Sequence, residues 1–490
     1  MKIKLIPKKD IENRHPIGLH SATDMEYARI ATEIATEMAK QDVDDIPADG
    51  LRLMALNIAM YFEDVVADAG IWRSFTDKVK ELYGRRLPFY DVDDDNYYQD
   101  EPNLVDVKLL VWYTMLEVHN GRIGNPENPI LEKLATAAYS VLDKNFETVP
   151  VNDKLKEFFA TPQFLDDFYR QRNILNWFVF GCYLTYMPYA MDLVVDHAHQ
   201  MVNMLHCDMN LALYHMESTL PYTCNVGPLA LKPQQWLAMT LRANGKVEAA
   251  EKVENQKAKE YKPYKVVNVD DDKNVTFEDV DGEEFTVENK ELNLMPDATI
   301  AKGWSGISAF VEYDGAWHLN GAMSWDRGAK AFDELRKDYE GHQNLHEAYD
   351  KLVAEAGGSR LFYFADTKQL KDFFLEKLPF ADDTAKKFSL PEGHENILLY
   401  VPEDYGDFQI FPDGALCVKD DRNPYYNQKW AKNQTLNFVL SVNPTVQQYL
   451  ISHNLLPDAT INSSKGLERG NEIVQQNFDF LVKAVSSRLH

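Results

Sequence analysis

The chain has 490 residues, of which 45% are hydrophobic and 12% aromatic, enough to bury the cores of about two to four domains. It contains 51 lysines and arginines against 77 aspartates and glutamates, and the resulting net charge of -26 disfavours nucleic-acid partners and anionic membrane surfaces. Four cysteines without a CxxC pair, and a start without a long apolar core, favour a reducing compartment, so we expect an acidic cytoplasmic protein.

Residues 1–262 are predicted to form a mainly helical domain. Apolar side chains recur at intervals of three and four between Leu51 and Val65, which predicts a helix with one buried face. The same reasoning predicts further helices over residues 104–119, 130–144, 164–186 and 189–217, with a charged connecting helix over 246–261. Pro188 separates the third of these helices from the long fourth one.

A central stretch, residues 173–191, contains no charged residue and approaches the length of a membrane-spanning helix. It also contains Asn176, Gly181 and Pro188, which are poorly suited to a lipid-facing segment. A central helix that is apolar on all sides and buried in protein explains the same stretch. We therefore expect no membrane partner.

Residues 263–326 carry the signature of short antiparallel strands. Asp281-Gly282 and Asp314-Gly315 each stand between alternating runs and suit two-residue hairpin turns, which need positive backbone φ angles. The predicted strands cover residues 264–269, 275–280, 283–287, 307–313 and 316–321. Five short strands of this kind predict a small barrel-like β module, either a barrel or a curled sheet, with an aromatic core.

Residues 327–490 return to a mixed pattern. Helices are predicted over 329–356, 367–378 and 468–489, and strands over 360–365, 397–401, 408–411 and 415–419. The fold class is therefore multidomain α+β, with a helical domain (1–262), a small five-stranded β module (263–326) and an α+β domain (327–490).

A polar stripe follows the long helix predicted after Pro188. Its members are spaced by four, three, four, three and four residues and share one helix face: Asp192, Asp196, His199, Asn203, His206 and Asn210. Carboxylates and imidazoles one turn apart can share a divalent metal ion or act together as general base and orienting acid. Because ligands from one helix cannot close around an ion, carboxylates such as Glu63 and Asp64 would have to complete the site.

The same stripe has a second explanation. Val194, Ala198 and Met201 fill the opposite side of the predicted helix, so the polar residues can equally form the solvated face of an amphipathic helix. The prediction of a metal site at Asp192, Asp196, His199 and His206 therefore stands beside a purely structural interpretation.

A second candidate site lies in the loop between a predicted strand and a predicted helix near the carboxyl end. Arg422, Asn423, Tyr425 and Tyr426 combine a fixed positive charge, an amide and two aromatic rings, which suits an anionic or planar ligand. Alternatively, Asn423-Pro424 starts an ordinary turn and the two tyrosines fill the domain.

No complete catalytic motif is present in the sequence. Phosphate-binding GxxxxGK, dinucleotide-binding GxGxxG and nucleophile-elbow GxSxG patterns are missing. His342 and His346 have the spacing of a zinc protease helix, but Gln343 stands where such an enzyme has its glutamate. These observations favour a binding or interaction protein whose partner is a protein or small molecule, and the alternative is a metal-dependent hydrolase that uses the polar stripe.

Two pairs of segments resemble a known family. YFEDVVADAGIWRSFT and ELYGRRLPFYD near the front, with DRNPYYNQKWA and LLPDATIN near the end, are similar to a family of uncharacterised Bacteroidetes proteins known as a domain of unknown function. The segment TDMEYARIA and the hairpin block fit the same pattern. The resemblance implies a bacterial, cytoplasmic protein with one architecture spanning the chain, and it brings no assigned reaction, ligand or catalytic residue.

Overall fold

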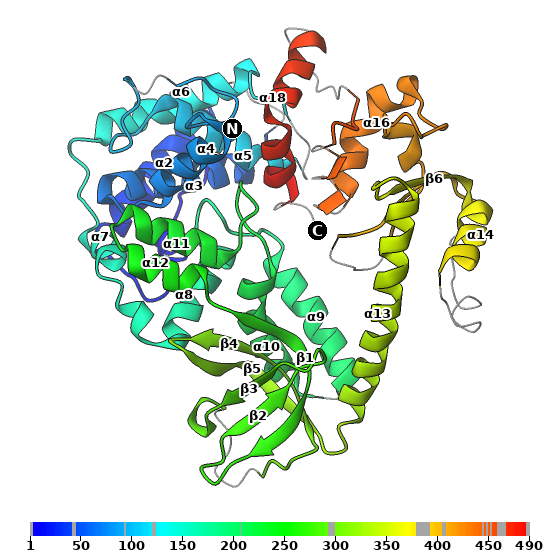
Figure 1. Cartoon of the computed structure of the whole chain (residues 1–490). Coiled ribbons are helices and arrows are strands. Elements are labelled where there is room, and N and C mark those ends of the chain that lie inside the picture. The colour runs from blue at the N-terminus through cyan, green and yellow to red at the C-terminus, as the bar shows by residue number, and fades with distance from the viewer. Residues whose placement is uncertain are drawn as a thin grey trace. The chain divides into compact units, whose positions relative to one another are not determined.

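The computed structural model divides the chain into two compact units. It describes residues 3–41, 46–92, 95–119, 124–205, 207–292, 299–378, 393–403, 408–442, 445–446, 449–450, 453–457 and 467–486. Unit 1 comprises Met1–Glu278, Glu284–Gly328 and Lys483–His490, and unit 2 comprises Asp279–Glu283 and Ala329–Val482. The α+β class is confirmed (Figure 1), whereas the domain boundaries at 262 and 326 stay predictions.

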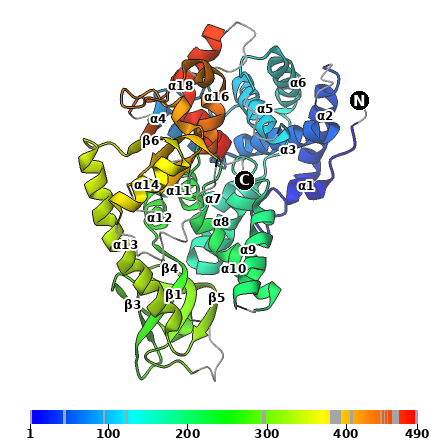
Figure 2. The same ribbon diagram turned by 90° about the vertical axis from the view of Figure 1, so that its right-hand side faces the viewer.

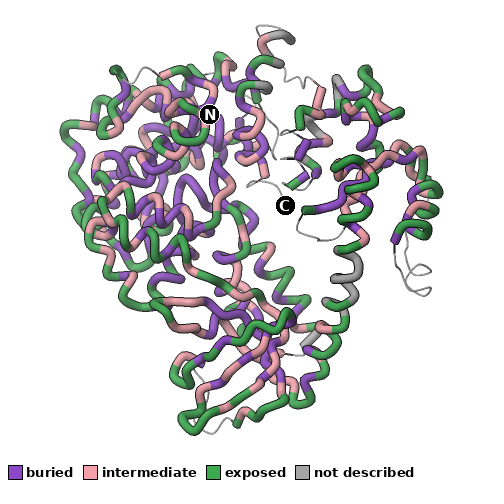
Figure 3. The backbone as a smooth tube through the Cα atoms, in the orientation of Figure 1, coloured by how far each residue is buried: buried purple, intermediate pink, exposed green. Residues whose placement is uncertain are grey.

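Unit 1 consists mainly of helices. They are α1 (Lys8–Glu12), α2 (Asp24–Met38), α3 (Ala48–Ala67), α4 (Ile71–Tyr83), α5 (Leu104–Val118), α6 (Pro129–Asn145), α7 (Asp153–Ala160), the 3-10 helix η1 (Gln163–Asp166), α8 (Phe168–Phe180), α9 (Ala190–Leu205), α10 (Met209–Thr223), α11 (Pro233–Ala243) and α12 (Val247–Glu254). The apolar face predicted between Leu51 and Val65 is buried on α3, and Figure 3 shows long buried stretches in this helix and in α5. Among the residues described, no helix has the length and apolar character needed to cross a bilayer.

The start of α4 depends on a buried carboxylate of α3. Gly70 precedes α4 and offers no capping side chain, so Asp64 takes that role. Its two oxygens accept hydrogen bonds from the backbone N–H of Ile71 at 3.1 Å, the backbone N–H of Trp72 at 2.7 Å and the hydroxyl of Tyr183 at 2.8 Å. These bonds satisfy helix-terminal donors that would otherwise be buried without partners.

The prediction of one long helix over residues 189–217 is wrong, because the helix is interrupted before residue 209. α9 ends at Leu205 and α10 begins at Met209, after Asp208 in an extended conformation. The Asp208 carboxylate accepts hydrogen bonds from the backbone N–H groups of Asn210 at 2.8 Å and Leu211 at 3.4 Å. An aspartate that caps a new helix competes with continuation of the old one, and helical periodicity alone does not detect this competition.

The five-stranded sheet of unit 1 is antiparallel and open. Its strands are β1 (Ala258–Val269), β2 (Val275–Glu278), β3 (Glu284–Val287), β4 (Ser305–Tyr313) and β5 (Ala316–Asp326), in the order β3-β2-β1-β4-β5. The short 3-10 helix η2 (Asn289–Glu291) follows β3. The five predicted strands and the Asp314-Gly315 hairpin turn are confirmed, and both turn residues have positive φ angles of 48° and 82°. The sheet is not closed, and its barrel-like character stays a prediction.

Only the first half of the charged segment 246–261, which was predicted to be one helix, is helical. α12 ends at Glu254, and β1 already begins at Ala258. Ala258 pairs with Val311 and Lys259 pairs with Phe310 across the ladder between β1 and β4. Pairing with a distant strand overrides the helical propensity of this charged segment, as tertiary contacts commonly do.

Unit 2 has a small antiparallel sheet at its centre. Its elements are α13 (Lys330–Glu355), β6 (Leu361–Asp366), α14 (Thr367–Lys377), β7 (Glu395–Tyr400), β8 (Gln409–Phe411), the 3-10 helix η3 (Gly414–Cys417), α16 (Gln428–Ser441) and most of α18 (Leu467–Ser486), and the strand order is β6-β7-β8. The prediction of a strand over residues 415–419 is wrong, because the 3-10 helix η3 occupies Gly414–Cys417. The Asn423 amide donates to the carbonyl oxygens of Ala415 at 2.6 Å and Val418 at 2.7 Å, which favours a compact turn over a ladder.

Helix α10 packs against the sheet of unit 1 through a close approach to β5. Figures 1 and 2 both show α10 beside these strands, and contacts link it to β1 and β5. The backbone N–H of Ala322 donates to Nδ1 of His215 at 3.0 Å, and the Asn320 amide donates to the carbonyl oxygen of Ser218 at 3.0 Å. Gly321 lies between these two residues with φ +96°, and a Cβ atom there would meet His215 Nδ1 at 2.5 Å.

Replacing Gly321 with alanine therefore tests this packing. We expect Gly321→Ala to lower the free energy of unfolding by about 2–4 kcal/mol, because it combines a strained backbone with overpacking. Gly315→Ala is the matched control, since Gly315 has φ +82° but nothing within 4 Å of the added atom. In urea unfolding, Gly315→Ala should lose only the free energy that the strained backbone costs. Equal losses in the free energy of unfolding for the two variants would contradict the close approach.

Candidate functional site

The polar stripe predicted as a metal site lies on the exposed side of α9. Asp192, Asp196 and His199 are exposed, and His206 lies outside the described residues. Asn210 belongs to α10 instead, because the helix that carries the stripe ends before that residue and a new helix begins at Met209. Within the described part of the chain, no group of three closely spaced metal-ligating atoms includes these residues. The metal role of the stripe stays a prediction.

The two carboxylates expected to complete that site are buried on α3 and bound to other partners. Oε1 of Glu63 accepts a hydrogen bond from the Asn152 amide at 2.8 Å, and Oε2 lies 2.7 Å from Nε2 of His15. Asp64 caps α4, and burial raises the pKa of its carboxyl group above the ordinary value. Both side chains therefore organise the helical core.

The loop predicted to bind a ligand makes many contacts within unit 2. The Arg422 guanidinium pairs with Asp420 and donates to Ser359, while Asn423 is buried and saturated by backbone partners. The Tyr425 hydroxyl reaches Gln369 at 3.5 Å. The ligand-binding role of Arg422, Asn423, Tyr425 and Tyr426 stays a prediction, and these bonds are what the structural interpretation of the loop requires.

A different site is formed in unit 1, where α10 and α11 meet the sheet. A cleft of about 670 Å³ opens there, and its walls come from helices α9 to α12 and from strands β1, β4 and β5. Its main polar residues are His197, Thr219, Tyr222, Lys232, Gln234, Gln235, Glu254, Lys259, Glu260, Tyr261 and Asn320. We call this space the α10–sheet cleft. Its volume lies within the range of about 300–1,000 Å³ found for small-molecule sites.

Three buried polar atoms on the walls of the α10–sheet cleft lack a hydrogen-bond partner among the described residues. They are Oη of Tyr222, Oε1 of Gln234 and Oη of Tyr261. Tyr222 is 5% exposed and Gln234 is 7% exposed, so both side chains are held in place by packing. Burial raises the pKa of Tyr261 to about 12 and that of Tyr222 further, so both hydroxyls keep their protons at neutral pH. Two donors and one acceptor thus lie unpaired in the walls of the cleft.

A buried arginine lies behind the inner wall of the α10–sheet cleft. Arg172, on α8, is 5% exposed, and its guanidinium donates to Oδ1 of Asn320 at 3.2 Å and to the Tyr214 hydroxyl at 3.2 Å. It also lies 5.2 Å from the ring of Tyr169. In the part of the chain that the structure describes, no carboxylate pairs with Arg172 and its Nε has no partner. The full positive charge therefore acts on its surroundings, including Tyr222.

The rim of the α10–sheet cleft carries charges of both signs. Lys232 donates to the carbonyl oxygen of Tyr222 at 3.3 Å, and Lys259 lies beside the ring of Phe285 at 4.9 Å. Glu254 is paired with Arg242, which neutralises that carboxylate. The deep wall is consequently positive, because Arg172 lies behind it while the acidic residues are restricted to the rim.

His215 stands next to this wall and is held neutral. It is fully buried on α10, and its Nδ1 accepts a hydrogen bond from the backbone N–H of Ala322, so the ring proton resides on Nε2. Burial lowers the pKa of His215 to about 4, and the charge of Arg172 acts in the same direction. A neutral His215 leaves Arg172 as the buried positive charge of this region.

Sequence reasoning did not identify the residues of the α10–sheet cleft. Arg172 directly precedes the uncharged stretch 173–191, and its position at the edge of an apolar segment was the available signal. Tyr222 and Gln234 lie on the consecutive helices α10 and α11, whereas Asn320 lies on β5, much later in the chain, and none of the three belongs to a local motif. Only the tertiary packing of α10 on the sheet brings them together.

Comparisons with known proteins identify a family and no characterised relative. A family model with the description "Protein of unknown function (DUF3843)" matches residues 4–304 and 314–486. The search of curated proteins and the search of solved structures each found no match. The predicted resemblance to a family of uncharacterised proteins is confirmed, and it covers nearly the whole chain.

The lowered pKa of His215 predicts a loss of stability in acid. Between pH 6.5 and pH 4 the unfolded chain binds this proton and the folded chain does not, so stability falls as the pH drops through that window, by about 3 kcal/mol. His215→Asn keeps an acceptor for the Ala322 N–H but cannot be protonated. Urea unfolding across this range should show a smaller loss in that variant, whereas exposed His199→Asn should behave as wild type. Identical pH profiles for His215→Asn and wild type would contradict the assignment.

Proposed function

The chain belongs to the DUF3843 family of proteins of unknown function, and from its site we propose that it is a small-molecule-binding protein. The ligand class is a small organic anion that enters the α10–sheet cleft. The carrying observation is the buried guanidinium of Arg172, which has no carboxylate partner among the described residues and lies behind the wall formed by Tyr222 and Asn320.

The energetics of burial support an anionic ligand. A buried charge that is not paired costs several kcal/mol, because neutral hydrogen-bond acceptors and aromatic rings replace the lost hydration only in part. Asn320 and Tyr214 supply two neutral acceptors to Arg172. A carboxylate or phosphate in the cleft would add a favourable Coulomb interaction through a wall of low dielectric constant. Ligand binding would then recover part of the cost of burying the arginine.

The remaining groups of the α10–sheet cleft define the rest of the ligand. The Tyr222 and Tyr261 hydroxyls can donate, and Oε1 of Gln234 can accept, so the ligand should carry both acceptors and a donor such as a hydroxyl group. Met216, Ala309 and the two tyrosine rings supply apolar wall. A hydroxylated organic acid or an organic phosphate fits this combination better than a bare inorganic ion.

Several broader features also stay proposals. They are the division into three domains at residues 262 and 326, a barrel-like curvature of the sheet and a cytoplasmic location. The rings of Phe285 on β3 and Trp317 on β5 lie 5.2 Å apart, which supports curvature that brings the two edge strands together over a common core. The metal-dependent hydrolase remains the alternative function, and metal analysis of a variant lacking His199 tests it.

The Tyr222 hydroxyl gives the sharpest test of the ligand site. A thermal-shift screen with citrate, gluconate and glycerol phosphate should identify a stabilising anion, whose affinity is then measured by calorimetry. We expect Tyr222→Phe to weaken binding about tenfold or more, the value of one hydrogen bond to a charged group. The same variant should be as stable as wild type or more stable without ligand, because it removes a buried hydroxyl that has no partner.

Tyr27→Phe is the matched control. The Tyr27 hydroxyl donates to the carbonyl oxygen of Pro150 at 3.1 Å in the helical part of unit 1. Its loss should lower the free energy of unfolding by about 1 kcal/mol and leave the affinity for the anion unchanged. The proposal fails if no small organic anion stabilises the protein, or if Tyr222→Phe binds the selected anion as tightly as wild type.

A further inference from the structure

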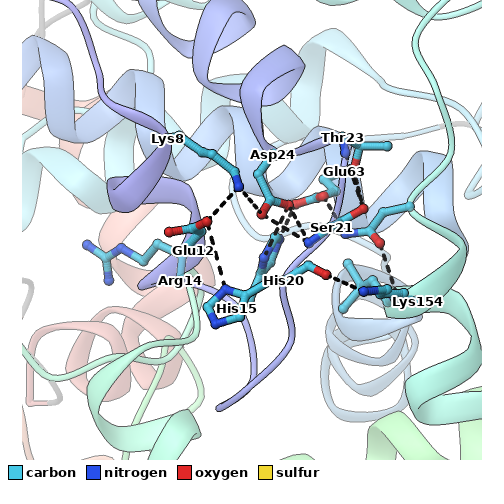
Figure 4. Close-up of polar contacts among 12 residues, drawn as sticks. Lys8, Glu12, Arg14, His15, His20, Ser21, Thr23, Asp24, Glu63 and Lys154 are labelled. Carbon is cyan, nitrogen blue, oxygen red and sulfur yellow. Dashed lines mark hydrogen bonds and ion pairs between the residues drawn. The ribbon is translucent and has the colours of Figure 1, made fainter.

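A second polar cluster in unit 1 brings together the amino-terminal segment and two helices of the core. Figure 4 shows its side chains converging from α1, the loop after it, α2 and α3: Lys8, Glu12, His15, His20, Asp24 and Glu63. Two overlapping groups of potential metal ligands occur here, each with its ligand atoms within 4.8 Å of one another. One consists of His15, Asp24 and Glu63, the other of Glu12, His20 and Asp24, so Asp24 belongs to both.

The inner part of the cluster orients one imidazole. His15 is 3% exposed, and its Nε2 lies 2.7 Å from Oε2 of Glu63. The other Glu63 oxygen accepts a hydrogen bond from the Asn152 amide at 2.8 Å. Metal-ligating histidines commonly donate their second ring N–H to a carboxylate in this way, which fixes the tautomer and leaves the other nitrogen free to coordinate.

The other ring nitrogen of His15 has no hydrogen-bond partner among the described residues. This buried Nδ1 faces Oδ1 of Asp24 at 3.8 Å, which is too long for a hydrogen bond. The Asp24 oxygens accept hydrogen bonds from the backbone N–H of Ser21 at 3.2 and 3.0 Å, which hold the carboxylate in this position. A ring nitrogen and a carboxylate oxygen held at this separation are arranged to share a cation.

The outer part of the cluster supplies two more ligands from the solvent side. Nδ1 of His20 lies 3.8 Å from Oε1 of Glu12, and its side chain is 65% exposed. The Lys8 ammonium lies 2.8 Å from Oε1 of Glu12 and 3.8 Å from Oδ2 of Asp24. Lys8 thus provides the positive charge that these carboxylates require, and its partly exposed side chain can move into solvent.

We propose that this cluster is a zinc site, in which Nδ1 of His15, Asp24, Glu12 and His20 bind one Zn²⁺ ion and Glu63 orients His15 from outside. Ligand atoms of a tetrahedral zinc site with bonds of about 2.0 Å lie about 3.3 Å apart. The two observed 3.8 Å separations would need to close by about half an ångström, and because the four ligand atoms do not all lie within 4.8 Å of one another, the inner and outer ligands would also need to move toward each other. Two imidazoles with two carboxylates favour zinc over calcium or magnesium, which prefer sites made only of oxygen ligands.

The position of Lys8 makes the proposal testable in two directions. Zinc and the Lys8 ammonium compete for the same carboxylates, so removing the ammonium should tighten zinc binding while removing a ligand should weaken it. A purely structural ion-pair cluster predicts no zinc binding in any variant. Lys9, the adjacent exposed lysine, is the matched control for the general effect of losing one positive charge.

The experiment is calorimetric titration of chelator-treated full-length protein with Zn²⁺ at pH 8, because metal ligands must lose their protons before they bind and this loss is favoured at higher pH. We expect one zinc per chain, binding about tenfold or more weaker in Glu12→Gln and in His20→Gln, and several-fold tighter in Lys8→Gln. Lys9→Gln and His199→Ala should bind as wild type. Glu12 and His20 are not fully buried, so these variants should fold, and unfolding curves without metal will verify that they do.

Cobalt provides an independent measurement of the same site. Co²⁺ in place of zinc should give the visible absorption of a tetrahedral ion in wild type, and this absorption should be lost in His20→Gln. The proposal is overturned if zinc binds neither wild type nor Lys8→Gln. It is overturned equally if binding is unaffected by Glu12→Gln and His20→Gln, or if it is lost in His199→Ala, which would assign the metal to α9.

Discussion

The close approach of α10 to β5 is the constraint on which the candidate ligand site depends. Gly321 has no side chain, so the imidazole of His215 reaches the backbone N–H of Ala322. The preceding residue, Asn320, bonds to the carbonyl oxygen of Ser218 on α10 and accepts from Arg172 on α8. Three consecutive residues of one strand thereby fix the sheet on the helices, position the buried arginine and form part of the cleft wall.

Buried polar groups in unit 1 fall into two kinds that differ in how well they are satisfied. Asp106 accepts hydrogen bonds from the hydroxyls of Tyr61 at 2.8 Å and Tyr97 at 2.9 Å, and burial raises its pKa to about 7. Both oxygens of Asp106 thus have hydrogen-bond donors within the core, which is typical of a structural network. Tyr222 retains a hydroxyl without a partner at the wall of a cleft, and Arg172, behind that wall, retains an Nε without one. Since an unmet polar group costs stability, its presence beside a cleft argues for binding, whereas the satisfied Asp106 network argues for folding alone.

Sequence reasoning recovered the elements that local chemistry determines. The hairpin at Asp314-Gly315 and the buried face of α3 follow from turn preference and periodicity, and both are present. The break before α10 was missed because the Asp208 cap competes with a continuous apolar pattern, and the early start of β1 was missed because distant pairing with β4 overrides helix propensity. The cleft could not be predicted, since its residues meet only through tertiary packing.

The charge of the whole chain sets a condition on any anion that binds near Arg172. With a net charge of -26, the protein repels anions at long range, so attraction must come from the local field of a buried cation. Salt screens charges that are exposed and more than about 8 Å away at physiological ionic strength, and it acts much less on a buried guanidinium. Added salt therefore weakens the general repulsion more than the local attraction. An anion site of this kind gains selectivity from its depth. Anions that stay at the surface are repelled by its acidic residues and do not come close enough to Arg172 to be attracted.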